Sequence, residues 1–353
     1  MVLGPLMIDL HGPVLAPEER ELLAHPLVGG VILFSRNYES RAALTALTAA
    51  IHAVRSPRLL IAVDHEGGRV QRFRAEFTEL PALHRIGEQY DRDPEGACRI
   101  ATELGWLMAV ELRTAGVDFS FAPVLDLYNG HSRVINDRAF HAEPDAVARL
   151  AQAYLRGMHG AGMAAVGKHF PGHGTVIADS HHELPVDRRS FYDLTTRDLL
   201  PFRLLASAGI DAFMPAHILF PAVDGVPVGY SKIWLEQILR RALEFHGAIF
   251  SDDLSMSGAM IAPTALERAR LALAAGCDMC LLCNDRPAVE AVLGGLTLEP
   301  APLIQVRLMR MHGRPPPVAA AALAQHPRWR EAAALATRLD AEPVLELGDD
   351  APA

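Results

Sequence analysis

Residues 145–170 read DAVARLAQAYLRGMHGAGMAAVGKHF and contain one complete unit of the predicted fold. The part up to His159 has apolar residues at helical spacing, which predicts an amphipathic helix. Gly162 follows it, as expected where a helix ends on a residue that tolerates positive φ. The run 165–170 is then apolar and of strand length, which is typical of a parallel strand that is buried on both faces.

The same alternation of short apolar runs and longer helical patterns continues along the chain. The predicted strands are 6–9, 30–34, 59–64, 119–124, 165–170, 212–217, 248–252 and 278–283, and helices are predicted at 41–54, 97–114, 145–159, 192–208, 232–245 and 265–275. An alternation repeated about eight times predicts an α/β fold, a single (β/α)8 barrel of the TIM type, with a doubly wound open sheet as the alternative. No G-x-G-x-x-G opens a helix after an early strand, which argues against a dinucleotide-binding fold.

We expect one domain in this chain, followed by a tail. A single catalytic barrel with a C-terminal helix is predicted over residues 1–340, and a short flexible tail over residues 341–353. The proline-rich segment 300–317 has no strand pattern and is expected to wrap the outside of the barrel. Residues 326–339 are predicted to form the last helix.

The composition argues against several classes of partner. The formal net charge of −9 disfavours nucleic acid, because a phosphate-binding surface needs an excess of basic residues. Four cysteines in 353 residues are too few for a secreted disulfide scaffold, and the start MVLGPLMIDLHG lacks the pattern of a signal peptide. No apolar run reaches the ~18–20 residues that span a bilayer. We therefore expect a cytoplasmic protein with no membrane partner, and a monomer by default.

Polar residues gather where the predicted strands end. The strand 59–64 ends in Asp64, 165–170 contains KHF, 212–217 ends in PAH and 248–252 ends in SD. On a parallel barrel these ends converge on one pocket, although they lie far apart in the sequence. The two longest connections, 125–143 and 171–188, also follow strands, so they belong to the same face and are expected to be functional.

Ser251, Asp252 and Asp253 bring two carboxylates to the end of one strand. A carboxylate at the mouth of a barrel can attack an anomeric carbon or stabilise positive charge on it. An aspartate can equally cap the helix that follows. With two adjacent aspartates, one can cap and the other can react, and the continuity of the strand favours Asp252 as the residue that faces the pocket.

Asp179 and His181 form a candidate acid–base pair. Residues two apart in an extended chain point the same way, so the carboxylate can orient the imidazole and raise its basicity. A solvated polar loop is the alternative. Lys168 is costly inside an apolar strand unless it reaches a polar site. His169 is expected to reach that site as well only if the chain bends at Pro171.

Asp64, Arg69 and Arg72 flank the turn at residues 67–68. Charged groups in this arrangement can hold the vicinal hydroxyls of a sugar through strong hydrogen bonds. An ion pair within the loop is the alternative.

Two patterns invite a metal interpretation. Cys277, Cys280 and Cys283 have the spacing of iron–sulfur ligands. Alternation in a strand, however, separates the second cysteine from the other two, so buried core cysteines are favoured. His169 and His173 have a spacing that suits a metal on a helix, but the intervening proline and glycine break that geometry. We therefore predict no metal site.

Several long motifs occur in the order of a known family. They are HPLVGGVILFSRNY (25–38), AVDHEGGRVQRF (62–73), FAPVLD (121–126), GKHFPGHGTVIADSHHELP (167–185), MPAH (214–217) and IFSDDLSM (249–256). Together they resemble the bacterial β-N-acetylhexosaminidases of glycoside hydrolase family 3, of the NagZ type. The similarity runs from about residue 5 to residue 284, so it covers nearly the whole predicted barrel.

The resemblance implies a role for particular residues. It makes Asp252 the nucleophile, His181 the general acid and base, and Asp179 the partner of His181. The sugar-binding residues that it implies are Asp64, Arg72, Arg138, Lys168 and His169. Asp137, Phe140 and His182 depart from the usual family residues.

The function that the resemblance implies is that of a retaining, exo-acting β-N-acetylglucosaminidase. Its substrate would be the small carbohydrate N-acetylglucosaminyl-β-1,4-anhydro-N-acetylmuramic acid, or its peptide-bearing muropeptide form, in peptidoglycan recycling. No cofactor is implied. Two alternatives remain: a metal-dependent barrel hydrolase that uses His11, His169 and His217, and a non-catalytic sugar-binding barrel.

Overall fold

The structure is a computed structural model that describes residues 2–130, 132, 134–176, 184–297 and 301–341. Among these residues, eight parallel strands form one sheet in which neighbours follow the order of the chain and the last strand lies beside the first. The strands are β1 (Leu6–Asp9), β2 (Val28–Leu33), β3 (Leu60–Val63), β6 (Phe119–Ser120), β7 (Ala164–Phe170), β8 (Ala212–Pro215), β9 (Ala248–Ile249) and β10 (Cys280–Leu282). A parallel bridge between Phe250 and Met279 joins the last two strands and closes the ring, which confirms the predicted (β/α)8 barrel.

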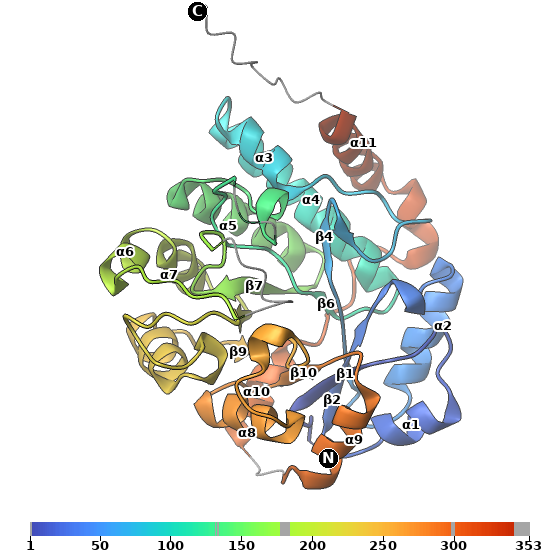
Figure 1. The fold of residues 1–353 in the computed structure, drawn as a ribbon. Helices are drawn as coiled ribbons and strands as arrows, with labels where there is room; N and C mark the ends of the chain where they lie inside the picture. The colour runs from blue at the N-terminus through green and yellow to red at the C-terminus, as the bar shows by residue number, and fades with distance from the viewer. Residues whose placement is uncertain (1, 131, 133, 177–183, 298–300, 342–353) are drawn as a thin grey trace, which may run out of the picture.

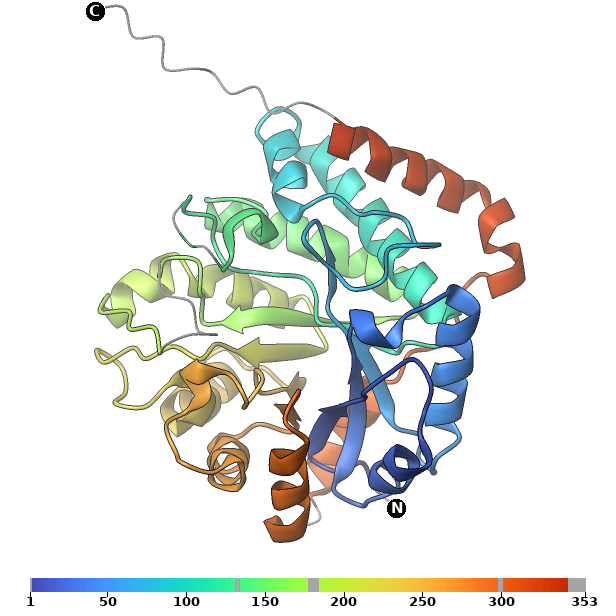
Figure 2. The same ribbon diagram turned by 45° about the vertical axis from the view of Figure 1, so that its right-hand side comes forward.

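Helices surround the strands on the outside of the ring (Figure 1 and Figure 2). They are α1 (Pro17–Leu23), α2 (Arg41–His52), α3 (Leu83–Tyr90), α4 (Pro94–Thr114), α5 (Pro144–Gly160), α6 (Phe191–Thr196), α7 (Leu199–Ser207), the π-helix η4 (Ile233–Ala242), α8 (Ala265–Ala275), α9 (Arg286–Gly295), α10 (Pro302–Arg310) and α11 (Pro327–Ala341). A hairpin of β4 (His65–Gly67) and β5 (Val70–Gln71) follows β3, and short turns of helix form η1 (Ser35–Asn37), η2 (Asn136–Arg138), η3 (Val228–Tyr230), η5 (Ser257–Ala259) and η6 (Ala320–Gln325). No helix in the described part of the chain is long and apolar enough to cross a membrane.

Each of the eight predicted strand runs overlaps one of the eight observed strands, but five of the strands are shorter than predicted. In the run 119–124 only the first two residues form β6, and Val124 returns to the sheet as an isolated bridge with Lys168. A tight turn interrupts the ladder, because the Ala122 amide donates to the Ser120 carbonyl at 2.8 Å. The strands are fully buried, as apolar runs between two layers should be.

The prediction of one helix over residues 192–208 is wrong, because the chain forms α6 and α7 with a break at Arg197 and Asp198. Pro201 explains the break: its ring clashes with the carbonyl four residues earlier, which belongs to Arg197, so one helix cannot continue through both. The segment 300–317 contains α10, whose first residue is Pro302. The last helix is confirmed as α11, and residues 342–353 of the predicted tail lie outside the described residues.

Three aspartates connect the amino-terminal ends of neighbouring strands. Asp118, Asp211 and Asp278 precede β6, β8 and β10, and each carboxylate accepts a hydrogen bond from an amide of the strand before it. The donors are Ile61 in β3 (3.0 Å), Ala165 in β7 (2.9 Å) and Ile249 in β9 (2.8 Å). Each aspartate also pairs with a basic side chain, so these carboxylates stabilise the end of the barrel opposite to the predicted pocket.

We predict that Asp118→Ala lowers the free energy of unfolding by about 3–5 kcal/mol, since it removes one partner of a buried ion pair. Asp118 is fully buried and lies 3.1 Å from Arg58 and 3.4 Å from Arg113, which would lose its counter-charge. Urea denaturation near neutral pH measures the change. The control is Glu88→Ala, which breaks a half-exposed pair with Arg85 and should cost less than about 1 kcal/mol. Equal losses in the two variants would contradict the prediction.

Candidate active site

A cavity of about 430 Å³ opens at the carboxyl ends of the strands. Six of the residues predicted from the sequence line it: Asp64, Arg72, Arg138, Lys168, His169 and Asp252. They come from the segment after β3, the loop after β6, β7 itself and the segment after β9, so the barrel brings them together as expected. The other two, Asp179 and His181, lie outside the described residues.

The lysine at the end of β7 is the centre of a charged cluster. Only 3% of the Lys168 side chain is exposed, and its Nζ lies 2.7 Å from Asp64 Oδ1 and 2.6 Å from Glu66 Oε1. Burial lowers the pKa of Lys168, but the two carboxylates raise it more, so the pKa is higher than usual and the side chain stays protonated. Arg72 lies 3.9 Å from Asp64, so the ion pair within the loop exists and both of its members still line the cavity.

Glu66 belongs to this cluster, although the sequence analysis does not single it out. Arg138 donates to both of its oxygens, from Nε at 2.8 Å and from a terminal nitrogen at 2.9 Å. Burial raises the pKa of Glu66, but Arg138 and Lys168 lower it more strongly, so this buried carboxyl is ionised. The signal available in the sequence was a carboxylate among glycines, two residues after Asp64. This signal could be interpreted only with the knowledge that Arg138 and Lys168 require counter-charges.

The hairpin after β3 places these groups by means of its two glycines. Gly67 and Gly68 have φ of 106° and 54°, a left-handed conformation that side chains rarely adopt, and they form the turn between β4 and β5. A Cβ on Gly67 would lie 2.5 Å from the carbonyl oxygen of Pro81, so the turn also has no room for a side chain. Glu66 and Arg72 thereby reach the cavity from the two arms of one hairpin.

Asp126 is a second functional residue that the sequence analysis missed. It is completely buried, and its carboxylate accepts hydrogen bonds from His169 Nδ1 at 2.6 Å and from the backbone amide of His173 at 2.7 Å. Burial raises the pKa of Asp126, but His169 lowers it more, so Asp126 is an ionised acceptor and Nδ1 of His169 carries a hydrogen. The residue ends the motif FAPVLD, which was its signal in the sequence.

Both Lys168 and His169 line the cavity, although simple alternation sends only one of two neighbouring residues inward. The register of β7 against β8 shifts between Lys168 and Phe170, so the irregularity lies within the strand. The bend that was expected at Pro171 is therefore replaced by an irregularity before that residue, between Lys168 and Phe170.

The two adjacent aspartates have different surroundings. Asp253 accepts hydrogen bonds from the Ser255 amide at 3.0 Å, the Ser255 hydroxyl at 2.7 Å and the Cys283 amide at 3.2 Å. Burial outweighs these hydrogen bonds and raises the pKa of Asp253 to about 6. Asp252 lines the cavity, and its Oδ1 accepts a hydrogen bond from the Asp253 amide at 2.8 Å. His217 also supports this strand end, since its Nε2 donates to the Asp253 carbonyl at 3.0 Å.

The residues considered for metal binding lie in different surroundings. Within the described residues, no group of three or more His, Cys, Asp or Glu side chains could hold a metal ion. His169 and His217 are hydrogen-bonded as above, and His11 is exposed. Cys277, Cys280 and Cys283 are buried free thiols whose pKa burial raises, which fits the core interpretation.

A parallel barrel with a lysine, arginines and carboxylates around a polar cavity at the carboxyl ends of its strands is the arrangement of a barrel enzyme. Residues 7–310 match the N-terminal domain of glycosyl hydrolase family 3, and the chain belongs to this family. The β-hexosaminidase of Nitrosospira multiformis is 53% identical over 329 residues, with 93% of this chain and 94% of the relative covered. That of Thioalkalivibrio sulfidiphilus is 55% identical over 347 residues, with 98% and 99% covered.

The solved structures agree with the sequence relatives. The crystal structure of NagZ from Neisseria gonorrhoeae in complex with N-trifluoroacetyl-D-glucosamine is 44% identical, with a TM-score of 0.92, and covers 96% of this chain and 99% of its own. The chain is therefore an enzyme, a glycosidase of the β-hexosaminidase kind, which argues against a non-catalytic sugar-binding barrel.

We predict that Glu66→Gln reduces kcat/KM roughly 100-fold, because Lys168 and Arg138 lose the charge that fixes their positions and small misplacements are costly. The measurement is hydrolysis of an aryl N-acetyl-β-D-glucosaminide. Glu95→Gln is the control, because Glu95 pairs with Arg149 at 2.5 Å on an exposed surface. Wild-type kinetics in Glu66→Gln would show that the cluster does not depend on this charge.

We predict that Asp253→Asn changes how stability depends on pH. The pKa of Asp253 is raised to about 6 in the folded protein, so ionisation of this carboxyl opposes folding. The wild type should lose about 3 kcal/mol relative to the variant as the pH rises from below the unfolded pKa of about 4 to above the folded pKa of about 6. Urea denaturation across this range tests the effect, and a constant difference between the two proteins at every pH would contradict it.

Proposed function

We propose that this β-hexosaminidase releases terminal N-acetylglucosamine from N-acetylglucosaminyl-β-1,4-anhydro-N-acetylmuramic acid, with or without its peptide, during peptidoglycan recycling. The reaction retains the anomeric configuration through a covalent ester on Asp252. The observation that carries the proposal is the division between the two aspartates. Asp253 uses both oxygens to hold the backbone and Ser255, whereas the side chain of Asp252 lines the cavity.

The charged cluster supplies the sugar-binding side of the cavity. Asp64, Arg72, Arg138, Lys168 and His169 present charged or polarised donors and acceptors, which suit vicinal hydroxyl groups. Asp126 holds the His169 ring so that its Nε2 is the nitrogen left for a ligand. The sugar-bound NagZ of N. gonorrhoeae carries a glucosamine derivative, which supports the same class of ligand for this chain.

In the proposed reaction, His181 protonates the glycosidic oxygen while Asp252 attacks the anomeric carbon, and the bond to the leaving sugar breaks. His181 is then neutral and, oriented by Asp179, removes a proton from the water that attacks the ester. Asp252 leaves as a carboxylate. The roles of His181 and Asp179 rest on the family resemblance. In support, His173 at the start of their segment lines the same cavity as Asp252.

The proposal includes a cytoplasmic monomer that needs no cofactor and acts on a small carbohydrate. A reducing compartment is supported by the four cysteines, all of which are free thiols.

The experiment compares wild type, Asp252→Ala and His181→Ala on 4-nitrophenyl N-acetyl-β-D-glucosaminide with EDTA present. Asp252→Ala should lose roughly 10⁴-fold or more of kcat, as expected when a nucleophile is removed. His181→Ala should lose about 100-fold, because 4-nitrophenol leaves with little help from an acid. EDTA should have no effect on the wild type.

The intermediate is tested separately. A 5-fluoro N-acetylglucosaminyl fluoride should add one sugar to the wild type and none to Asp252→Ala, measured by intact mass and peptide mapping. Asp91→Ala is the control, because Asp91 pairs with His141 on the surface. Labelling of another residue, or full activity in Asp252→Ala, would refute the assignment of the nucleophile.

A further inference from the structure

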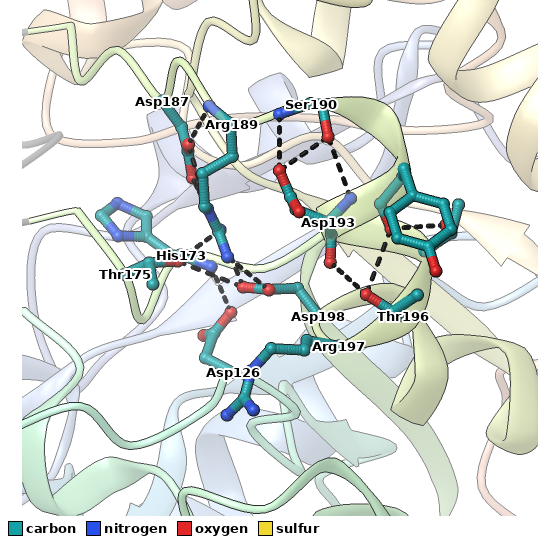
Figure 3. A network of polar contacts seen from close by, with 12 residues as sticks. Asp126, His173, Thr175, Asp187, Arg189, Ser190, Asp193, Thr196, Arg197 and Asp198 are labelled. Carbon is teal, nitrogen blue, oxygen red and sulfur yellow. Dashed lines mark hydrogen bonds and ion pairs between the residues drawn. The ribbon is translucent and has the colours of Figure 1, made fainter.

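We infer that Arg189 is a positioning residue for the acid–base step: it fixes both ends of the segment that carries Asp179 and His181. The inference rests on the function proposed for His181. Figure 3 shows Arg189 reaching between Asp187 and Asp198, with Thr175 beside them. Residues 177–183 themselves lie outside the described residues, so the inference depends only on the flanking residues.

The start of the segment is held at Thr175. Its hydroxyl oxygen accepts a hydrogen bond from Arg189 at 2.5 Å and donates one to Asp198 Oδ1 at 3.1 Å. Gly172 allows this approach, since its φ is 136° and a Cβ there would lie 2.9 Å from the Asp198 side chain. Two residues before Thr175, the His173 amide donates to Asp126, which also orients His169. The start of the segment is thus tied to the sugar-binding side of the cavity.

The end of the segment is held at Asp187. Its carboxylate accepts hydrogen bonds from Arg189 Nε at 3.0–3.1 Å and from a terminal nitrogen at 2.7 Å. The backbone on either side is paired as well, because the Asp187 amide donates to the Leu219 carbonyl at 2.9 Å and the Leu219 amide donates to Pro185 at 3.0 Å. This end therefore cannot move without breaking contacts with the loop after β8.

Asp198 connects these contacts to the rigid part of the barrel. It lies at the break between α6 and α7 and receives two hydrogen bonds from Arg189, at 2.7 and 3.0 Å. The helix that follows packs onto the sheet, since the Phe202 ring lies 5.5 Å from that of Phe170 in β7 and 5.5 Å from that of Phe213 in β8. The break that Pro201 imposes thus places a buried carboxylate where it can hold the segment.

The charges favour a permanent contact. Asp198 is 1% exposed and Asp187 is 6% exposed, so both need a cation. Burial lowers the pKa of Arg189, but the two carboxylates raise it more, and the guanidinium stays charged. Arg189 reaches Asp187, Asp198 and Thr175 from three different nitrogens, and the single nitrogen of a lysine ammonium cannot reproduce this planar spread of donors. Arg189→Lys therefore keeps the charge and removes the positioning.

The test separates positioning of the acid from general damage. We measure kcat/KM for aryl N-acetyl-β-D-glucosaminides with leaving groups from 2,4-dinitrophenol to phenol, in Arg189→Lys, Thr175→Val and His181→Ala. If Arg189 positions the acid, Arg189→Lys should lose about 100-fold on the phenyl substrate and only a few-fold on the dinitrophenyl substrate. Thr175→Val should show a smaller loss of kcat/KM with the same dependence on the leaving group. This variant remains informative if Arg189→Lys folds poorly.

Azide provides a second readout. With the dinitrophenyl substrate, azide nitrogen attacks the anomeric carbon of the ester, the bond to the Asp252 oxygen breaks and the carboxylate leaves with the electron pair, so no base is needed. Azide should raise kcat and yield the β-glycosyl azide in Arg189→Lys and His181→Ala. The control, Arg328→Lys, alters a pair with Glu103 of the same bidentate kind (2.7 and 3.1 Å) and should match the wild type.

Each outcome decides between the proposals. In one outcome, Arg189→Lys loses activity equally on all substrates and azide does not restore it, while His181→Ala shows both the dependence on the leaving group and the rescue by azide. Arg189 then has only a structural role, and the proposed function is unaffected. Wild-type behaviour of Arg189→Lys and Thr175→Val also overturns the inference. If His181→Ala shows neither signature, the acid–base assignment fails and the inference fails with it.

Discussion

A lysine ammonium that is almost completely buried stays charged only if carboxylates lie against it, and Lys168 imposes this condition on the mouth of the barrel. Asp64 and Glu66 meet it from the hairpin after β3, and Arg138 from the loop after β6 then balances Glu66. Three separate segments are thereby fixed relative to one another by ion pairs. The cations Lys168 and Arg138 here face the anions Asp64 and Glu66, an arrangement that suits recognition of a sugar by hydrogen bonds.

The fold follows from the sequence because its main constraint is local. Strands buried on both faces must be apolar throughout, so all eight strands could be recognised in the sequence. Their repeated alternation with helices made a closed barrel the simplest arrangement, as observed. Errors occurred where a contact distant in sequence, or a single proline, decides the result. Pro201 divides the predicted helix 192–208, and a turn at Ser120 shortens the fourth strand.

The sequence revealed the site residues that break an apolar pattern or match a family motif. Lys168 and Asp252 are such residues, and the barrel places both at one cavity. Glu66, Asp126 and Arg189 were not predicted, because each acts on another side chain or on the backbone, through a contact that the sequence pattern does not reveal. Asp126 has meaning only once His169 is seen 2.6 Å away, a contact that spacing along the chain does not encode. The same holds for Arg189 and Thr175.

The residues that hold the reacting groups in place share one physical property: their hydrogen-bonding groups are occupied by the protein itself. Asp253 accepts from Ser255 and Cys283, and its own amide donates to Asp252, so the structural aspartate also orients the proposed nucleophile. Asp126 stands in the same relation to His169. A side chain that reacts with the substrate must change its hydrogen-bond partners during the reaction. A side chain that orients the reacting one must keep its partners. The cavity therefore needs a surrounding layer of saturated polar residues, and that layer sets the geometry in which the reacting groups meet.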